Sequence, residues 1–84
     1  MAPELRPKPG LNRLELADLI DQLRDNLHED PESWENPDLD RFLESLGAWT
    51  RNMDGWFNNR GEPVPEAPSW ELLGHMLLAA RVYE

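Results

Sequence analysis

The alternation of apolar and polar positions predicts three amphipathic helices along the chain. The first is expected over residues 13–28, where the apolar side chains share a stripe roughly 100° wide on a helical projection. Asn12, followed three residues later by Glu15, resembles a capping box and marks the start of this helix. The stripe consists of Leu16, Leu19, Ile20, Leu23 and Leu27, and the residues facing away from it include Asp18, Asp21 and Asp25.

The second predicted helix, over residues 37–58, carries the widest apolar stripe, an arc of about 140°. Asn36 is its expected N-cap. Gly47 and Gly55 each lower helix stability by roughly 0.5–1 kcal/mol relative to alanine, so either indicates close packing or, at Gly55, an early end of the helix. The stripe consists of Leu39, Phe42, Leu43, Leu46, Trp49, Met53, Trp56 and Phe57.

A proline-rich connector at residues 61–68 separates the second helix from the third, which is expected over residues 70–83 with Ser69 as its cap. Apolar residues cover about half of the circumference of this third helix, and Leu78 and Val82 fall outside that half. Two interpretations stay open. The helix lies between the other two, or Leu78 and Val82 form an exposed patch for a second copy or a partner.

Two shorter segments complete the pattern. Residues 1–11 contain three prolines, one glycine and little to bury, so we expect a mobile N-terminal tail that does not carry the fold. Asp30 followed by Pro31 predicts a one-turn helix near residues 31–35. Trp34 is then either a plug over the neighbouring helix ends or an exposed recognition aromatic; the general burial of tryptophan favours the plug.

These elements predict an all-α fold in which residues 12–84 form one domain, a compact bundle of three main helices. With no cysteine available for a disulfide, a chain of 84 residues must rely on large side chains or on a partner. The expected core consists of Leu16, Ile20, Leu23, Leu27, Leu39, Phe42, Leu46, Trp49, Met53, Trp70, Leu73, Met76, Leu77 and Ala80.

The charge balance narrows the function classes. Seventeen acidic residues against eight basic ones give a net charge of −9, which argues against binding to nucleic acid or to anionic membranes. Residues 13–54 hold twelve of the acids and four arginines. Such a surface suits a basic protein partner, although acidic charge also serves solubility. Without an apolar run of about 20 residues or a signal-peptide pattern, we expect a cytoplasmic protein.

Candidate catalytic chemistry is absent from the sequence. His28 and His75 lie on separate helices without metal-ligand spacing, and Glu71, four residues before His75, is a simple ion-pair partner for it. No phosphate-binding glycine loop, nucleophile motif or calcium-binding loop occurs. We therefore expect no enzymatic activity, no cofactor and no metal.

Several short motifs together resemble a bacterial family described as "domain of unknown function 7660". They are W-E-N-x-x-L-x-x-F-L at residues 34–43, A-W at 48–49, M-D-G-W-F at 53–57, and P-S-W at 68–70 with L-L-A-A-R-V-Y-E at 77–84. The resemblance covers nearly all of the chain beyond Asn12. It implies a small helical protein that ends near Glu84, and it carries no established activity, ligand or catalytic residue.

The sequence leads to two hypotheses of function. The first is a non-enzymatic protein-interaction module, such as an immunity or antitoxin-type protein, whose acidic face binds a basic partner. The second is a self-associating structural or accessory protein, a homodimer through Leu78 and Val82 of the third helix. Candidate partner-binding residues for the first hypothesis are Asp18, Asp21, Asp25, Asp40, Glu44, Trp34 and Trp56.

Overall fold

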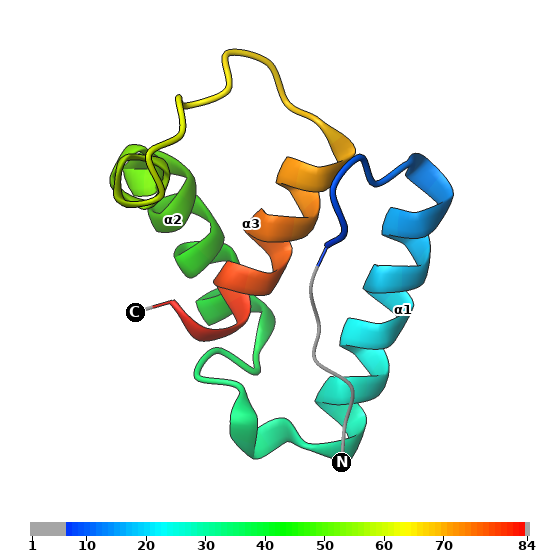
Figure 1. The fold of residues 1–84 in the computed structure, drawn as a ribbon. Helices are drawn as coiled ribbons and strands as arrows, with labels where there is room; N and C mark the ends of the chain where they lie inside the picture. Colours follow the sequence, from blue (N-terminus) through cyan, green and yellow to red (C-terminus); the bar gives the residue numbers. More distant parts are fainter. Residues whose placement is uncertain (1–6, 84) are drawn as a thin grey trace.

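Three long helices and one single helical turn make up the computed structural model, which describes residues 7–83 (Figure 1). No strand occurs within this range. The predicted all-α fold is confirmed, with helix ends within two residues of those expected, and the second helix continues through Gly55. The elements in chain order are α1 (Arg13–Glu29), η1 (Pro31–Ser33), α2 (Leu39–Asn59) and α3 (Trp70–Val82).

Side-chain caps begin α1 and α3 as the sequence predicts. The Asn12 side-chain oxygen accepts a hydrogen bond from the Glu15 N–H at 2.8 Å, and the Glu15 carboxylate accepts from the Asn12 N–H at 3.2 Å, which completes the capping box. The Ser69 hydroxyl accepts from the Leu72 N–H at 3.0 Å. These caps satisfy N–H groups that have no partner within their own helices.

A glycine with a left-handed backbone ends α2. Gly61 has φ of 70°, and its N–H donates to the Asn58 carbonyl at 3.1 Å. The Glu62 N–H donates to the Phe57 carbonyl at 3.0 Å. This pair of bonds is a Schellman motif, and it turns the chain out of the helix into the proline-rich connector.

The prediction that Asn36 caps α2 is wrong, because Asp38 takes that role with a 2.8 Å bond from the Arg41 N–H. Asn36 is buried and turns toward the end of α3 instead. Its backbone N–H donates to the Arg81 carbonyl at 3.1 Å. Its amide donates to the carbonyls of Ala80 at 3.1 Å and Tyr83 at 2.8 Å.

The hydroxyl of Ser45 adds a second link of this kind, donating to the Tyr83 carbonyl at 2.7 Å. Residues before and within α2 thus satisfy carbonyls that the last turn of α3 cannot pair within the helix. Spacing along the sequence cannot show such a bond, since its partners lie 38 to 47 residues apart.

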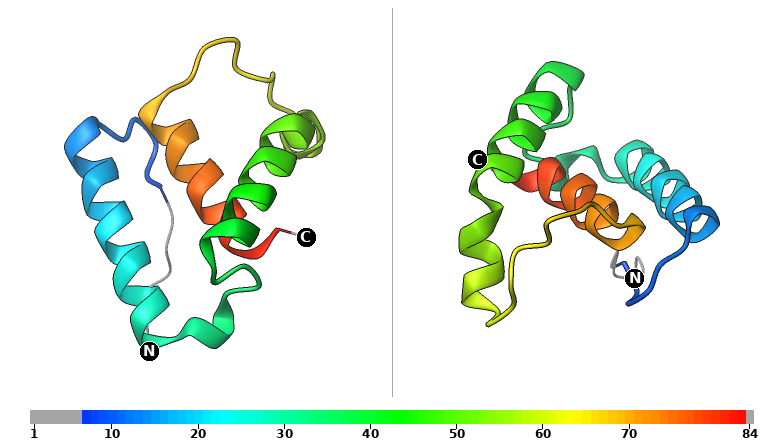
Figure 2. Two further views of the ribbon diagram at one scale, coloured as in Figure 1. Left: turned by 180° about the vertical axis from the view of Figure 1, so that it is seen from behind. Right: turned by 90° about the horizontal axis from the view of Figure 1, so that it is seen from above.

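Helix α3 is the central element of the fold. In Figures 1 and 2, α1 runs beside α3 with the first turns of both helices close together, and α2 crosses α3 from the other side. Helices α1 and α2 make scarcely any contact with each other. The third helix therefore has the central position of the first interpretation, and Val82 of the alternative patch is 42% exposed.

The core consists of two clusters on two sides of α3. The cluster against α1 holds the buried leucines Leu11, Leu16 and Leu19, packed by Leu73, Leu77 and Leu78. The cluster against α2 holds the buried residues Trp49, Phe57 and Leu72, packed by Met53, Trp56, Met76, Ala79 and Tyr83.

The predicted core is wrong at three positions, because Ile20, Leu39 and Trp70 are 45%, 72% and 46% exposed. Among the long helices, α1 and α2 each pack against α3, which covers only part of their wide apolar stripes and leaves Ile20 and Leu39 in solvent. Trp70 is the first residue of α3 and belongs to neither core cluster. Leu16, Leu23, Trp49 and Ala80 are buried as predicted. The other seven predicted residues are partly buried, namely Leu27, Phe42, Leu46, Met53, Leu73, Met76 and Leu77.

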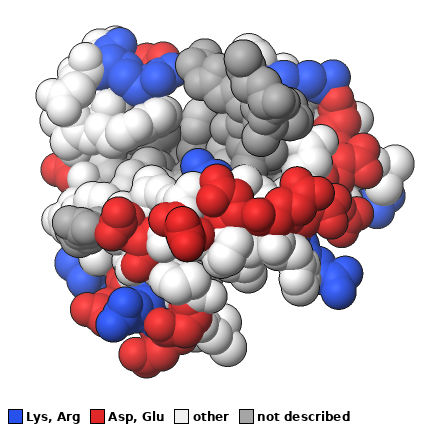
Figure 3. Space-filling model, turned by 90° about the horizontal axis from the view of Figure 1, so that it is seen from below, with Lys and Arg blue, Asp and Glu red and all other residues white. Residues whose placement is uncertain are grey.

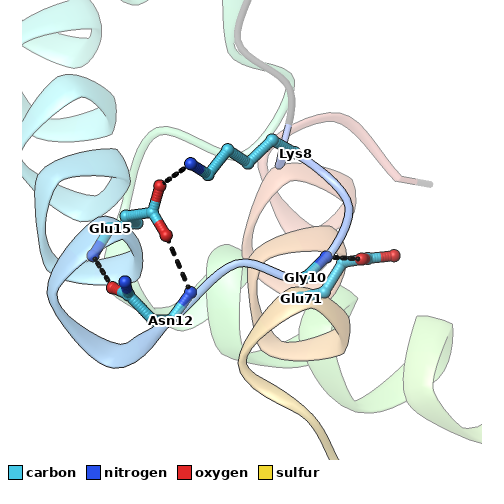
Figure 4. A network of polar contacts seen from close by, with 5 residues as sticks. All are labelled: Lys8, Gly10, Asn12, Glu15 and Glu71. Atoms are coloured by element: carbon cyan, nitrogen blue, oxygen red, sulfur yellow. Dashed lines mark hydrogen bonds and ion pairs between the residues drawn. The ribbon is translucent and has the colours of Figure 1, made fainter.

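Residues 7–11, expected to bury little, contribute Leu11 to the core. The Gly10 N–H donates to a Glu71 carboxylate oxygen at 2.9 Å, and Lys8 forms an ion pair with Glu15 (Figure 4). The bond from Lys8 contributes most to holding the pKa of Glu15 below its ordinary value. The expectation that the segment does not carry the fold is therefore wrong at Leu11; residues 1–6 and 84 lie outside the described range.

Residues 7–11 pack against α3 at a glycine, Gly74. A Cβ placed on Gly74 would approach Pro7 Cβ and a Leu19 methyl carbon to 3.1 Å, so the close approach of residues 7–11 to α3 depends on its absence. Among the helices that the structure describes, none is both long and apolar enough to cross a membrane.

We expect Asn36→Ala to lower the free energy of unfolding by about 2–4 kcal/mol, because it leaves carbonyls at the end of α3 without partners in a partly buried place. Chemical denaturation followed by circular dichroism measures this change. The exposed Asn59, replaced identically, should stay within about 0.5 kcal/mol of wild type. Equal effects at the two positions would contradict the role of Asn36.

Candidate functional site

The most charged part of the molecule is the corner that links α1 to α2. Residues 25–44 contain eight acidic side chains and a single basic one, Arg41, and all eight acids are exposed. Figure 3 shows acidic side chains forming a band across the face at the lower end of Figure 1. We call these eight residues the acidic band; they are Asp25, Glu29, Asp30, Glu32, Glu35, Asp38, Asp40 and Glu44.

The structure distributes the predicted acidic residues differently from the single face that we expected. Asp40 and Glu44 lie in the first turns of α2, and Asp25 lies near the end of α1, so these three belong to the acidic band. Asp18 and Asp21 are also exposed, but they lie nearer the start of α1 and outside the acidic band. Helices α1 and α2 flank α3 on different sides, so their acidic residues do not share one face (Figure 1). The acidic residues of the segment between the two helices lie between these two groups.

Sequence reasoning missed five members of the band, Glu29, Asp30, Glu32, Glu35 and Asp38, because it assigned binding roles to helix faces. The density of acids along the chain was the signal that could have found them. Within the band, Asp38 lies 3.6 Å from Arg41, and both side chains are more than half exposed. Such a pair contributes little to stability and leaves the negative charge accessible.

Trp34 closes the corner between α1, α2 and α3. Its indole N–H donates to the Asn26 side-chain oxygen at 2.7 Å, and its ring stacks on Phe42 at a centroid distance of 6.2 Å. Arg81 donates to the same Asn26 oxygen at 3.0 Å and lies 5.8 Å from the Trp34 ring centroid. The partly buried position of Trp34 therefore fits the plug interpretation, and its indole N–H is already hydrogen-bonded within the protein.

Trp56 is partly buried within an aromatic cluster at the other end of α2. Its ring meets Trp49 at 5.7 Å, Phe57 at 4.8 Å and His75 at 5.0 Å between centroids. The guanidinium carbon of Arg60 lies 4.4 Å from the Trp56 ring centroid, within the range of a cation–π contact. Trp56 thus ties the end of α2 to α3.

His75 lies at a cavity of about 290 Å³ under the proline-rich connector. Burial lowers the pKa of His75 below its ordinary value, and the positive charge of Arg60 acts in the same direction, while Glu71 and Glu62 oppose it. His75 Nε2 and the Glu71 carboxylate are 3.7 Å apart. One imidazole with one carboxylate offers proton binding.

No group of three or more His, Asp or Glu side chains within residues 7–83 is arranged to hold a metal ion.

The two candidate dimer residues, Leu78 and Val82, differ in their surroundings. Leu78 is partly buried and packs against the leucine cluster beside α1. Val82 is 42% exposed and lines a shallow groove of about 490 Å³ with Trp49, Trp56, Ala79 and Tyr83.

The model described as "Family of unknown function (DUF7660)" matches residues 12–84. No curated protein and no solved structure matches the chain.

The environment of His75 predicts a pH dependence of stability. Because the folded chain lowers this pKa, the unfolded chain binds more protons once the pH falls below about 6.5. The contribution of neutral His75 is therefore complete above that pH and is lost as the pH falls toward the folded pKa. His75→Gln should flatten the dependence of unfolding free energy on pH between about 7.5 and 5, measured by denaturation.

The matched control for this experiment is His28→Gln, at an exposed position on α1. It should keep the wild-type dependence on pH. A wild-type dependence in the His75→Gln variant would show that other groups are responsible.

Proposed function

The chain belongs to the DUF7660 family of unknown function, and we propose that it is a non-enzymatic protein-interaction module whose acidic band binds a basic protein. The observation that carries the proposal is the concentration of eight exposed acids and one arginine in residues 25–44. The band lies on a corner held by Asn36 and Trp34, so its charges are presented by a packed scaffold. Preorganised charge raises association rates and selects partners of opposite sign.

A concrete form of this function is an immunity or antitoxin-type protein of a bacterial cytoplasm that covers a cationic toxin. The support is the small size, the net charge of −9 and the absence of recognisable catalytic motifs. Attraction between the band and a basic surface would weaken as salt screens it over about 10 Å at 0.1 M ionic strength. Neighbouring genes that encode a basic toxin would identify the partner directly.

Replacing both Asp40 and Glu44 by Asn and Gln should lower the association rate with a basic partner captured from native extract by about tenfold at low salt. Surface plasmon resonance measures the rate. Asp54→Asn with Glu66→Gln is the matched control, since both residues are exposed and lie outside the band while the net charge changes equally. If no basic protein is captured and no toxin gene is adjacent, the proposal is wrong.

A second candidate function is self-association through the groove that Val82 lines with Trp49, Trp56, Ala79 and Tyr83. The exposed valine beside aromatic side chains is the observation that favours it. Here the chain would be a structural or accessory homodimer, with the end of α3 at the two-fold axis. Trp56 would then contact the second copy as well as Trp49, Phe57 and His75 of its own chain.

Sedimentation at high micromolar concentration distinguishes this candidate. A dimer that becomes monomeric with Val82→Asp, and persists with Val64→Asp in the connector, would support it; both positions are exposed. Leu78→Asp is unsuitable for this purpose, because it would place a carboxylate in the leucine cluster and destabilise the fold. A wild-type monomer at that concentration excludes the homodimer.

A further inference from the structure

An apolar strip lies uncovered on the first half of α2. Leu39 and Leu43 are 72% and 54% exposed, and their spacing of four residues places them on the same side of the helix, one turn apart. Gly47 follows after the same interval and is also exposed. We call Leu39, Leu43 and Gly47 the α2 strip.

The packing of the described chain does not account for this strip. A Cβ added at Gly47 would meet nothing within 4 Å among residues 7–83, so no close neighbour in this part of the chain requires a glycine there. Glycine within a helix lowers its stability relative to alanine. A surface glycine beside two exposed leucines leaves room for a backbone that comes from outside the chain.

The charge around the strip restricts what can cover it. Asp40 and Glu44 directly follow Leu39 and Leu43 in sequence, so they lie about 100° around the helix and border the two leucines, while the exposed Arg51 lies one turn beyond Gly47. Both belong to the acidic band. A second copy of the chain would bring two such borders together, and like charges facing each other oppose association.

The backbone of the site restricts the shape of the occupant. Residues 7–83 contain no strand, so a partner segment cannot be added to a sheet edge. A helix laid across α2 can insert its side chains between Leu39 and Leu43 and approach closely at Gly47. Helix against helix is therefore the mode of contact that this surface offers.

We propose that the α2 strip docks an amphipathic helix of the partner, with apolar residues against Leu39 and Leu43, its backbone near Gly47, and lysine or arginine side chains opposite Asp40 and Glu44. The inference rests on the proposed function, because it specifies where and how the basic partner binds. Apolar contact supplies specificity that charge attraction alone lacks.

Two synthetic peptides of about 18 residues serve as probes. The first places leucine and alanine on one face of a helix and lysine on the other, and the second contains the same residues in scrambled order. We expect the ordered peptide to bind at least about tenfold more tightly, a difference of about 1.4 kcal/mol. In nuclear magnetic resonance spectra of the full chain, it should shift the backbone amides of residues 39–47.

Substitution at Leu43 separates apolar contact from charge. Leu43→Glu adds negative charge beside the acidic band, so attraction by charge alone would strengthen binding of the ordered peptide. Docking on the strip predicts the opposite, a loss of at least about tenfold. Leu14→Glu is the matched control, since Leu14 is an exposed leucine of α1. It should leave the affinity nearly unchanged.

A pair of glycine substitutions tests the close approach. Gly47→Ala and Gly55→Ala both lie in α2, where an added Cβ would meet nothing within 4 Å. Each should raise the melting temperature by about 2–8 °C through helix propensity. Only Gly47→Ala should weaken binding of the ordered peptide, by several-fold, because its methyl group occupies the space of the docked backbone.

The outcomes distinguish failure of the docking site from failure of the proposed function. If both peptides bind equally and Leu43→Glu binds at least as tightly as wild type, the strip is not a docking site, while the acidic band still attracts a basic partner. If neither peptide binds at low salt, both proposals are wrong. If Leu43→Glu instead dissociates a dimer in sedimentation, a second copy covers the strip and the inference is overturned.

Discussion

Every packed contact between long helices in the described structure passes through α3. Helices α1 and α2 pack against different sides of α3 and hardly meet each other. The third helix therefore needs apolar residues over much of its circumference, which explains why Leu73, Leu77 and Leu78 serve one cluster while Leu72, Met76 and Ala79 serve the other.

This arrangement also explains the exposed surface. A helix that packs on one neighbour buries only part of a wide apolar stripe, so the edge of α2 at Leu39 and Leu43 stays in solvent. The corner between α1 and α2 contributes little apolar burial, and the acidic band around it holds eight of the seventeen acidic residues of the chain. Uncovered leucines and unneutralised carboxylates thus meet at the start of α2 as a consequence of the fold.

The W-E-N motif of the family resemblance has a structural explanation in these contacts. Trp34 binds Asn26 and stacks on Phe42, and Asn36 binds the carbonyls of Ala80 and Tyr83. These two residues hold the ends of all three helices together. Glu35, between them, is exposed and belongs to the acidic band. The motif therefore combines two residues that build the corner with one that contributes to its charge.

The sequence by itself determined the helices, their caps at Asn12 and Ser69 and the local density of acids, because these depend on residues within a few positions of one another. Only the tertiary structure decided that Asn36 binds α3, that Leu11 joins the core and that Ile20, Leu39 and Trp70 do not. An apolar stripe shows which side of a helix can be buried, whereas the number and position of its neighbours decide how much of it is. For the same reason, the exposure of the α2 strip depends on the tertiary structure, in which α3 is the one long helix of the described chain that packs closely against α2.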